Sequence, residues 1–539
     1  GNSNSFNTAV GYNSLLAVST GAANTAIGYR SLEAITTGSN NTGLGGRALN
    51  NITTSSQNTA VGQQSSRYNQ TGANNVSIGW EAMLGVSGNS HNDNTVVGAQ
   101  SMKGITTGGS NVSLGHQSLL SNTTGGNNVS LGVGSMYTNT SSSHTVAIGW
   151  RALNQLNGGA SNNAIGTSSQ RYNETGTQNT SFGYQALMGS SGNSHNYNTA
   201  IGASSQQIMT GTSNSSLGSS TLSNATSANY NVAVGSMALN ELTTGTSNVG
   251  IGLSASRYNQ TGSSNISIGF EALKGASTNS HSNNSAFGYQ SMRNITTGGN
   301  NVAIGYQSSL YNQTGTMNVS LGHQSLYGVS TNSHTGNTAI GYRAMFAVTT
   351  GSYNVAMGHQ SLASFTTGSS NAGIGVSALY SLTSGIANVA MGESAGASIG
   401  SEQHNTYVGH NSGRFVDDGN HNTAIGSEAM MSALTGNDAT YNVAIGRRSL
   451  KNITDGDSNV AVGYQAGDVL TTGGENTIIG YNADASASGG ANQIVIGKDA
   501  TGLADNSAVI GNSSVTDVYM GSDSGAVVHS GALVNDLTA

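Results

Sequence analysis

The chain repeats one phrase of about 17 residues from Asn7 almost to its C-terminus. One copy, residues 24–40, reads NTAIGYRSLEAITTGSN. Thirty copies contain the motif N-x-A-x-G or a variant of it, whose closing residue we call the marker glycine. Of the 29 gaps between successive marker glycines, 22 are 17 residues long, four are 19, and single gaps are 14, 16 and 20. Such a fixed period predicts a solenoid or fibrous array rather than several globular domains.

Apolar residues keep fixed places in the repeat. The residue before the marker glycine is apolar in all 30 copies, and the fourth residue after it is usually Leu or Met. Two residues before it stands Ala, Ser or Gly in 25 copies, and four before it stands Asn in 27. Because side chains two residues apart on a strand share a face, this alternation predicts a strand that ends at the marker glycine.

The glycine corners leave no room for helices of ten or more residues. We therefore expect an all-β fold, an elongated parallel β-solenoid. Each coil would contain a strand, a glycine bend, a short second strand and a polar turn, with the asparagines stacked in a ladder. The predicted core side chains include Ile27, Leu32, Ile78, Ile148, Ile201, Ile304, Ile340 and Ile425. The predicted bend glycines include Gly28, Gly79, Gly149, Gly202, Gly305 and Gly341.

A single column of such coils is expected to be marginally stable. Each coil buries about two large apolar side chains, worth roughly 1.5–3 kcal/mol each, whereas ordering its backbone costs about 1–2 kcal/mol per residue. The small residue two before the marker glycine would suit close approach of another chain. We therefore expect a parallel homotrimer, either intertwined or side by side, and a rod of roughly 140 Å at about 4.8 Å per coil.

Departures from the period divide the chain. Residues 1–480 form the regular shaft, residues 481–511 form modified terminal coils, and residues 512–539 leave the repeat as a transition or cap. The four 19-residue coils share the ending Asn-Ser-His, which we expect to protrude from a corner. The candidate receptor contacts in them are His91, His195, His281, His334, Asn89, Asn193, Asn279 and Asn332. A histidine triad for a metal on a trimer axis is the alternative.

Aromatic side chains often follow the marker glycine, and Trp80 and Trp150 are further candidate contacts. Their rings could stack on sugars if this position faces outward, or they could cover a seam between chains.

Composition excludes several classes of function. Charged residues make up 7% of the chain and the net charge is −7, so we expect no nucleic-acid partner. There is no cysteine, and no apolar run approaches the roughly 20 residues of a membrane helix, so we expect no membrane insertion. No unique cluster of nucleophile, base and orienting group occurs, so we expect no catalytic residues, metal or cofactor, and no enzyme.

The repeat resembles known fibres. N-x-A-I-G-x-x-S/A is similar to head repeats of trimeric autotransporter adhesins, as is the 14-residue spacing that ends at Gly511. The longer text N-T-A-I-G-Y-x-S/A-L-x-x-x-T-T-G more closely resembles bacteriophage-type tail fibres and fibre adhesins. In these proteins, stretches similar to residues 509–512 and 518–521 often precede a C-terminal intramolecular chaperone that is cut off. The ending at Ala539 would then be that of the mature product.

This resemblance implies an extracellular homotrimeric fibre, on a virion tail or a cell surface. Its partners would be a cell-surface glycan or protein receptor and, at one end, a baseplate, virion or cell-envelope anchor. Three alternatives stay open. They are a structural filament without a receptor, an ice- or surface-binding solenoid suggested by the Thr-Thr pairs, and a glycan-degrading tailspike.

Overall fold

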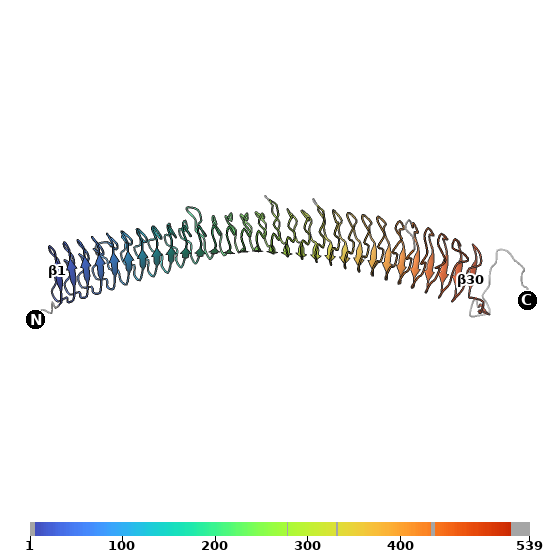
Figure 1. The fold of residues 1–539 in the computed structure, drawn as a ribbon, viewed down its shortest axis with the longest axis horizontal. Helices are drawn as coiled ribbons and strands as arrows, with labels where there is room; N and C mark the ends of the chain where they lie inside the picture. The colour runs from blue at the N-terminus through green and yellow to red at the C-terminus, as the bar shows by residue number, and fades with distance from the viewer. Residues whose placement is uncertain (1–5, 277–278, 330–331, 433–436, 519–539) are drawn as a thin grey trace, which may run out of the picture. The chain divides into compact units, whose positions relative to one another are not determined.

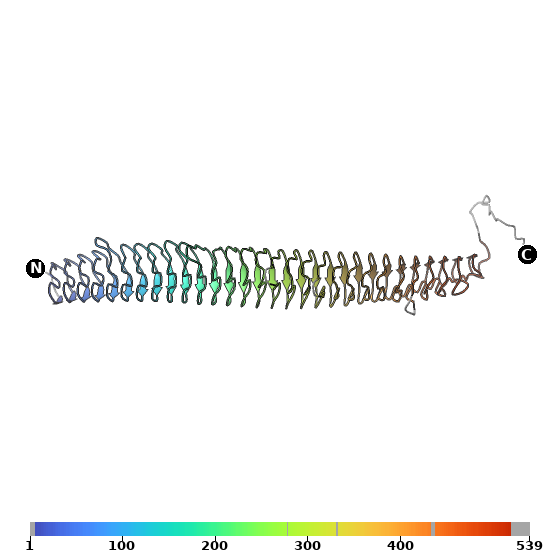
Figure 2. The ribbon, with the colours of Figure 1, turned by 90° about the horizontal axis from the view of Figure 1, so that it is seen from above.

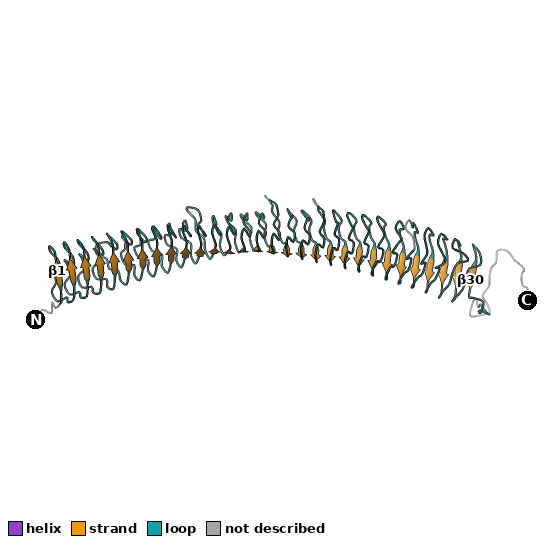
Figure 3. Cartoon of the chain, viewed as in Figure 1, coloured by secondary structure: helices purple, strands orange, loops and turns teal. Residues whose placement is uncertain are grey.

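The computed structural model describes residues 6–276, 279–329, 332–432 and 437–518. The chain divides into two units, Gly1–Thr316 and Met317–Ala539, and each is described by itself. Within the described residues there is no helix, and each coil contributes one three-residue strand (Figure 3).

The first unit contains eighteen described strands. They are β1 (Thr8–Val10), β2 (Thr25–Ile27), β3 (Thr42–Leu44), β4 (Thr59–Val61), β5 (Val76–Ile78), β6 (Thr95–Val97), β7 (Val112–Leu114), β8 (Val129–Leu131), β9 (Val146–Ile148), β10 (Asn163–Ile165), β11 (Thr180–Phe182), β12 (Thr199–Ile201), β13 (Ser215–Leu217), β14 (Val232–Val234), β15 (Val249–Ile251), β16 (Ile266–Ile268), β17 (Ser285–Phe287) and β18 (Val302–Ile304).

The second unit contains twelve described strands. They are β19 (Val319–Leu321), β20 (Thr338–Ile340), β21 (Val355–Met357), β22 (Ala372–Ile374), β23 (Val389–Met391), β24 (Thr406–Val408), β25 (Thr423–Ile425), β26 (Val443–Ile445), β27 (Val460–Val462), β28 (Thr477–Ile479), β29 (Ile494–Ile496) and β30 (Ala508–Ile510). The predicted cap, residues 512–539, lies mostly outside the described residues.

Within each unit, every strand pairs in parallel with the strand of the next coil (Figures 1 and 2). The register joins identical repeat positions, so Ala26 of β2 lies beside Gly43 of β3 and Ile27 beside Leu44. The predicted all-β, parallel β-solenoid is therefore confirmed for each unit.

The strands bury the opposite face from the one we predicted. The middle residue of β2, Ala26, is fully buried, whereas Ile27 is 42% exposed. Where the middle residue of the strand is small, the interior beside it is narrow because the turn after the marker glycine packs against it; Ser31 Oγ, for example, donates a hydrogen bond to Gly43 O at 2.8 Å. The small residue therefore faces its own coil and does not serve close approach of another chain.

The predicted core must be corrected accordingly. Leu32, four residues after its marker glycine, is fully buried as predicted. The residue before the marker glycine lies on the outer face. The core assignment is wrong for the exposed side chains of Ile27, Ile78, Ile304 and Ile425, while those of Ile148, Ile201 and Ile340 are half-buried.

The predicted second strand is a series of turns. Arg30 and Leu32 have φ angles of +56° and +51°, in the left-handed region, and hydrogen bonds between coils continue through this segment. For example, Leu32 N donates to Ala48 O at 3.0 Å. The marker glycine before it is required, because φ at Gly28 is +132° and a Cβ there would lie 2.7 Å from the carbonyl carbon of Gly45.

Stacked asparagines form the predicted ladder, which is buried inside the coils. Asn24 Oδ1 accepts hydrogen bonds from Asn41 N at 3.0 Å and from Asn41 Nδ2 at 3.1 Å. Asn41 Nδ2 also donates to Ser55 O at 2.9 Å, so the same amide ties the polar corner of the next coil to the strand. Each asparagine therefore satisfies backbone groups that the coil would otherwise bury without partners.

Candidate functional site

The four histidines of the 19-residue coils lie inside the solenoid. His91, His195, His281 and His334 are at most 1% exposed, so the prediction that they face a receptor is wrong. His91 O accepts a hydrogen bond from Asn75 Nδ2 at 2.8 Å, and in the next coil Gly108 O accepts the equivalent bond from Asn94. The histidine thus takes the place of a corner glycine, and its side chain is buried.

The imidazole substitutes for an apolar side chain. In the regular coil that begins at Gly98, Ile105 fills the interior seven residues after the marker glycine. In the 19-residue coil that begins at Gly79, the residue at this place is Val86, which is 48% exposed. A Cβ on the nearby Gly85 would lie 3.4 Å from His91 Nε2, which shows that the ring lies beside that backbone. The inserted segment therefore moves one side chain out and brings another in.

Burial controls the charge of these rings. No ring nitrogen of the four histidines has a hydrogen-bond partner among the described residues. Burial lowers the pKa of each imidazole to about 4, so all four are neutral at pH 7. Across the described ranges, no three His, Asp or Glu side chains are grouped so that they could hold a metal ion.

The asparagines of the insertions also belong partly to the interior. Asn279 Nδ2 donates to Ile295 O at 3.0 Å and Asn332 Nδ2 to Val348 O at 2.8 Å, and both residues are buried, so they are wrongly predicted as receptor contacts. Asn89 and Asn193 are half-buried. The exposed residues of the first two insertions are instead 86–88 and 190–192. The second of these corners projects beyond its neighbours in Figure 1, where it is teal.

Each 19-residue coil that carries one of these histidines, which we call a histidine coil, follows a coil with polar residues in its interior. Sequence reasoning missed this pairing. The preceding coil carries Tyr-Asn six and seven residues after its marker glycine, and the residue pairs are Tyr68-Asn69, Tyr172-Asn173, Tyr258-Asn259 and Tyr311-Asn312. In the first pair of coils, Asn69 Oδ1 accepts hydrogen bonds from Gly72 N at 3.0 Å and from His91 N at 3.3 Å. Asn259 Oδ1 does the same for Gly262 and His281.

These polar coils divide the apolar interior. In the first unit, clusters of buried apolar side chains extend over residues 15–60, 82–164, 186–242 and 272–303. Each gap between clusters falls on a Tyr-Asn coil. The signal in the sequence was the text Tyr-Asn-x-Thr-Gly followed in the next coil by Asn-Ser-His.

The aromatic row after the marker glycines lies on the outer surface. Trp80 and Trp150 are 48% and 47% exposed. Rings of successive coils stack, as for Phe270 and Tyr289 at a centroid distance of 5.0 Å in the first unit, and Tyr342 and His359 at 5.0 Å in the second. Both uses considered for this row, contact with a receptor and cover of a seam between chains, therefore stay predictions.

In the Thr-Thr corners, hydroxyl groups donate hydrogen bonds to backbone carbonyls of the next coil. Thr36 Oγ1 donates to Thr53 O at 3.2 Å, and Thr106 Oγ1 donates to Thr123 O at 2.9 Å. The first threonine of each such pair is therefore engaged by the next coil.

No helix in the described part of the chain is both long and apolar enough to cross a bilayer. Neither the family models nor the curated proteins with which the sequence was compared match it.

Proposed function

We propose that the chain is the shaft of an extracellular homotrimeric fibre, of the tail-fibre or fibre-adhesin kind, that attaches to a cell surface. The observation that carries this proposal is the row of residues directly before the marker glycines, which we call the outer apolar row. Its most exposed members in the first unit include Ile27, Ile78, Leu114, Phe182, Leu217 and Ile304, and those in the second include Leu321, Met357, Met391, Ile425, Ile445 and Ile479.

An apolar row of this extent favours association with copies of the same chain. Contiguous exposed apolar surface in a soluble protein marks an interface, because its burial removes the cost of hydrating it. The row repeats in every coil with one register, so an identical chain presents a matching row at the same spacing. A closed ring of parallel chains would bury all copies of the row around one axis. The number three comes from the resemblance of the repeat to trimeric fibres.

Attachment would use the surface that such an axis leaves exposed. The tips of the inserted corners, residues 86–88 and 190–192, and the aromatic row provide repeated contacts along the shaft. Individually weak contacts on one particle add through effective concentration, so a repeated shaft suits attachment by many sites.

The assembly is tested by measuring the mass of the purified protein in solution, which we expect to be three times the chain mass of 54.1 kDa. Combined Ile78→Glu, Leu114→Glu and Phe182→Glu changes in the outer apolar row should yield monomers whose circular dichroism is unchanged, because these side chains leave the coil interior intact. Thr37→Glu on an exposed polar corner is the matched control. A monomeric parent protein would refute the fibre.

Attachment is tested with labelled protein on bacterial cells. We expect adsorption that falls when Val86 and Val329, at exposed places in the inserted corners, are changed to Glu. A trimer that adsorbs to no surface would instead be a structural filament. Release of new reducing ends from surface polysaccharide would identify a tailspike and overturn the proposal.

A further inference from the structure

A row of polar side chains along the outer surface has a gap at Gly134. This row holds the second residue after each marker glycine, and its side chains bond from coil to coil. Gln100 Nε2 donates to Glu81 Oε2 at 3.0 Å, and Gln117 Nε2 donates to Gln100 Oε1 at 3.1 Å. The next member is Gly134, which has no side chain, and the one after that is Arg151. The row is therefore interrupted between Gln117 and Arg151.

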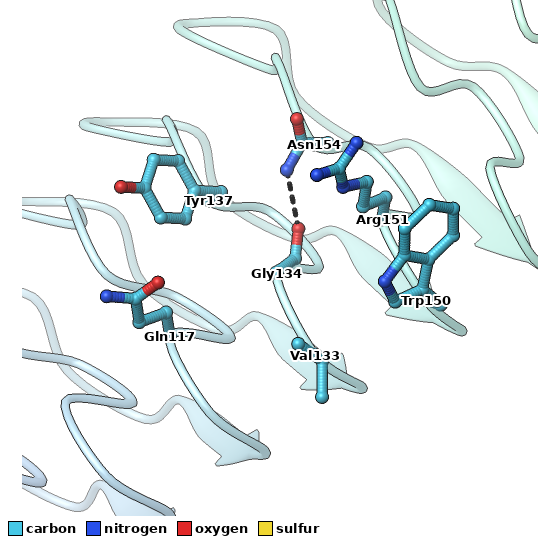
Figure 4. Close-up of a pocket in the computed structure, with 7 residues that line it drawn as sticks. All are labelled: Gln117, Val133, Gly134, Tyr137, Trp150, Arg151 and Asn154. Atoms are coloured by element: carbon cyan, nitrogen blue, oxygen red, sulfur yellow. Dashed lines mark hydrogen bonds between the residues drawn. The ribbon is translucent and has the colours of Figure 1, made fainter.

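The gap forms a hollow of about 370 Å³ (Figure 4). On one side of the hollow, Asn154 Nδ2 donates a hydrogen bond to Gly134 O at 2.7 Å. This bond holds the backbone at Gly134 in place. The residues that line it are Gln117, Val133, Gly134, Tyr137, Trp150, Arg151 and Asn154.

Two polar groups at the hollow have capacity to bind a ligand. The Arg151 guanidinium lies 4.6 Å from the centre of the Trp150 ring and, among the described residues, makes no hydrogen bond or ion pair. Gln117 donates to Gln100, but its own Oε1 accepts no hydrogen bond from a described residue, because the row ends there. In Figure 4 this oxygen lies on the side of Gln117 that faces the other labelled residues. A cationic donor and a neutral acceptor thus flank one small space.

The remaining lining is aromatic and apolar. Trp150 is 47% exposed, and Tyr137 and Val133 complete the wall. Aromatic rings of this kind offer an apolar face and a polar edge, which suits ligands that have both C–H faces and hydroxyl groups. A volume of about 370 Å³ lies near the lower end of the range for small-molecule sites, roughly 300–1,000 Å³.

We propose that this hollow binds one acidic sugar residue of a glycan. The sugar carboxylate pairs with the Arg151 guanidinium, which can form two parallel hydrogen bonds to it. A ring hydroxyl donates to Gln117 Oε1, and the C–H face of the pyranose packs against the aromatic wall. The inference rests on the proposed function only in placing such glycans on the surface to which the fibre attaches.

The binding test uses tryptophan fluorescence of the full chain. The protein has two tryptophans, so Trp80→Phe leaves Trp150 as the sole reporter. We expect D-glucuronic acid to change its emission in a saturable way, with a Kd of about 1–10 mM, and D-glucose to bind at least about tenfold more weakly. Acetate should give no saturable change. No saturable response to glucuronic acid, or an equal response to acetate, would overturn the proposal.

Filling the hollow provides the decisive variant. Gly134→Gln adds the missing side chain, and the coil should accept it because φ at Gly134 is +62°, close to the +52° of Gln117 and +54° of Arg151 in the same row. A Cβ there would lie 3.6 Å from its nearest neighbour, Asn154 Nδ2. We expect at least a tenfold loss of glucuronic acid binding with unchanged thermal unfolding. Full binding by this variant would refute the site.

Two further variants test separately where the sugar binds and whether its carboxylate contacts Arg151. Ser204→Gln places the same side chain in the same row of another coil and should leave binding unchanged. Arg151→Gln should weaken glucuronic acid binding about tenfold and leave glucose binding unaffected; equal weakening of both sugars would contradict the carboxylate contact.

The two proposals can fail separately. Sugar binding without cell attachment would defeat the proposed function alone. Full attachment by the Gly134→Gln variant, with no sugar binding by the parent protein, would defeat this inference alone.

Discussion

A regular coil and a histidine coil solve the same packing problem differently. The coil from Gly98 fills its interior with Ile105, whereas the coil from Gly79, two residues longer, turns Val86 outward and brings His91 in. Despite this, β5, β6 and β7 keep one register. The comparison shows that the solenoid requires the interior to be filled but does not require the filling group to be apolar. A corner can gain residues provided that one of them restores the lost volume.

The largest expected effect contrasts a marker glycine, which both kinds of coil contain, with a left-handed glycine of the histidine coil. A Cβ at Gly28 would lie 2.7 Å from both the carbonyl carbon and oxygen of Gly45, and backbone atoms there cannot move aside. Gly28→Ala should therefore destabilise its coil by at least about 4 kcal/mol. Gly85 of the histidine coil has φ of +74°, whereas Gly104 at the same place in the regular coil has no positive φ, and a Cβ on Gly85 would have space, so Gly85→Ala should cost about 1–2 kcal/mol. Hydrogen exchange of the neighbouring amides measures the loss of local stability in each variant. Equal losses in the two variants would contradict the predicted difference between these glycines.

Lowering the pH should destabilise the histidine coils and leave the stability of the regular coils unchanged. Burial lowers the pKa of His281 from 6.5 to about 4, so the opened corner binds a proton more readily than the folded one. Its stabilisation is therefore complete above pH 6.5 and is lost as the pH falls towards 4, by about 3 kcal/mol per corner. We expect amides of residues 279–284 to lose protection between pH 7 and pH 4.5 relative to amides of residues 296–300.

The matched variant for this test is His281→Leu, which should fill the interior and remove the pH dependence of its corner. His359→Leu changes a histidine of the exposed aromatic row and should leave the acid response of residues 279–284 unaltered. Retention of the response in His281→Leu would show that another group causes it.

The repeat allowed the strand positions to be predicted but not the face that they bury. Ala26 and Ile27 are adjacent, and hydrophobicity favoured Ile27 for the interior. The tight turn at Arg30–Leu32 leaves room only for a small side chain, so Ala26 points inward and Ile27 outward. That turn depends on left-handed φ angles at non-glycine residues, which no residue preference in the sequence indicated.

The histidines show a second limit of the sequence. An inserted polar segment is usually exposed, and residues 86–88 are, but His91 returns to a core position that is visible only once the corner closes. The hollow at Gly134 escaped notice for a related reason. A single glycine in a row of Gln and Arg has no meaning until the coils are stacked and the row becomes continuous.

The next smaller effect concerns the asparagine that precedes each histidine coil. Asn69 Oδ1 accepts from Gly72 N and His91 N, so Asn69→Leu would bury two amides without partners and should cost about 2–4 kcal/mol. Asn122 occupies the same repeat position before a regular coil, and its Oδ1 has no partner among the described residues. Asn122→Leu should therefore stay within about 1 kcal/mol of the parent. Local hydrogen exchange distinguishes the two, and similar costs would disprove the coupling to the histidine coil.

The smallest expected effect separates carboxylate from imidazole titration within one histidine coil. Burial raises the pKa of Glu271, but hydrogen bonds from Lys274, Gln290 and Arg293 outweigh burial and lower it to about 2. Its stabilisation is thus present above about pH 4.5 and is lost as the pH falls towards 2. Because this ion pair lies at the surface, Glu271→Gln should cost only about 0.5–1 kcal/mol at pH 7.

Gln324 already occupies this position in the His334 coil and accepts a hydrogen bond from Arg343 at 3.0 Å, so the amide fits. Between pH 6.5 and 4.5 the variant should lose protection in parallel with the parent, since His281 alone titrates there, and the two should converge only below pH 4.5. A slope that differs in the upper window would mean that Glu271, and not burial of the imidazole, sets the acid response of the corner.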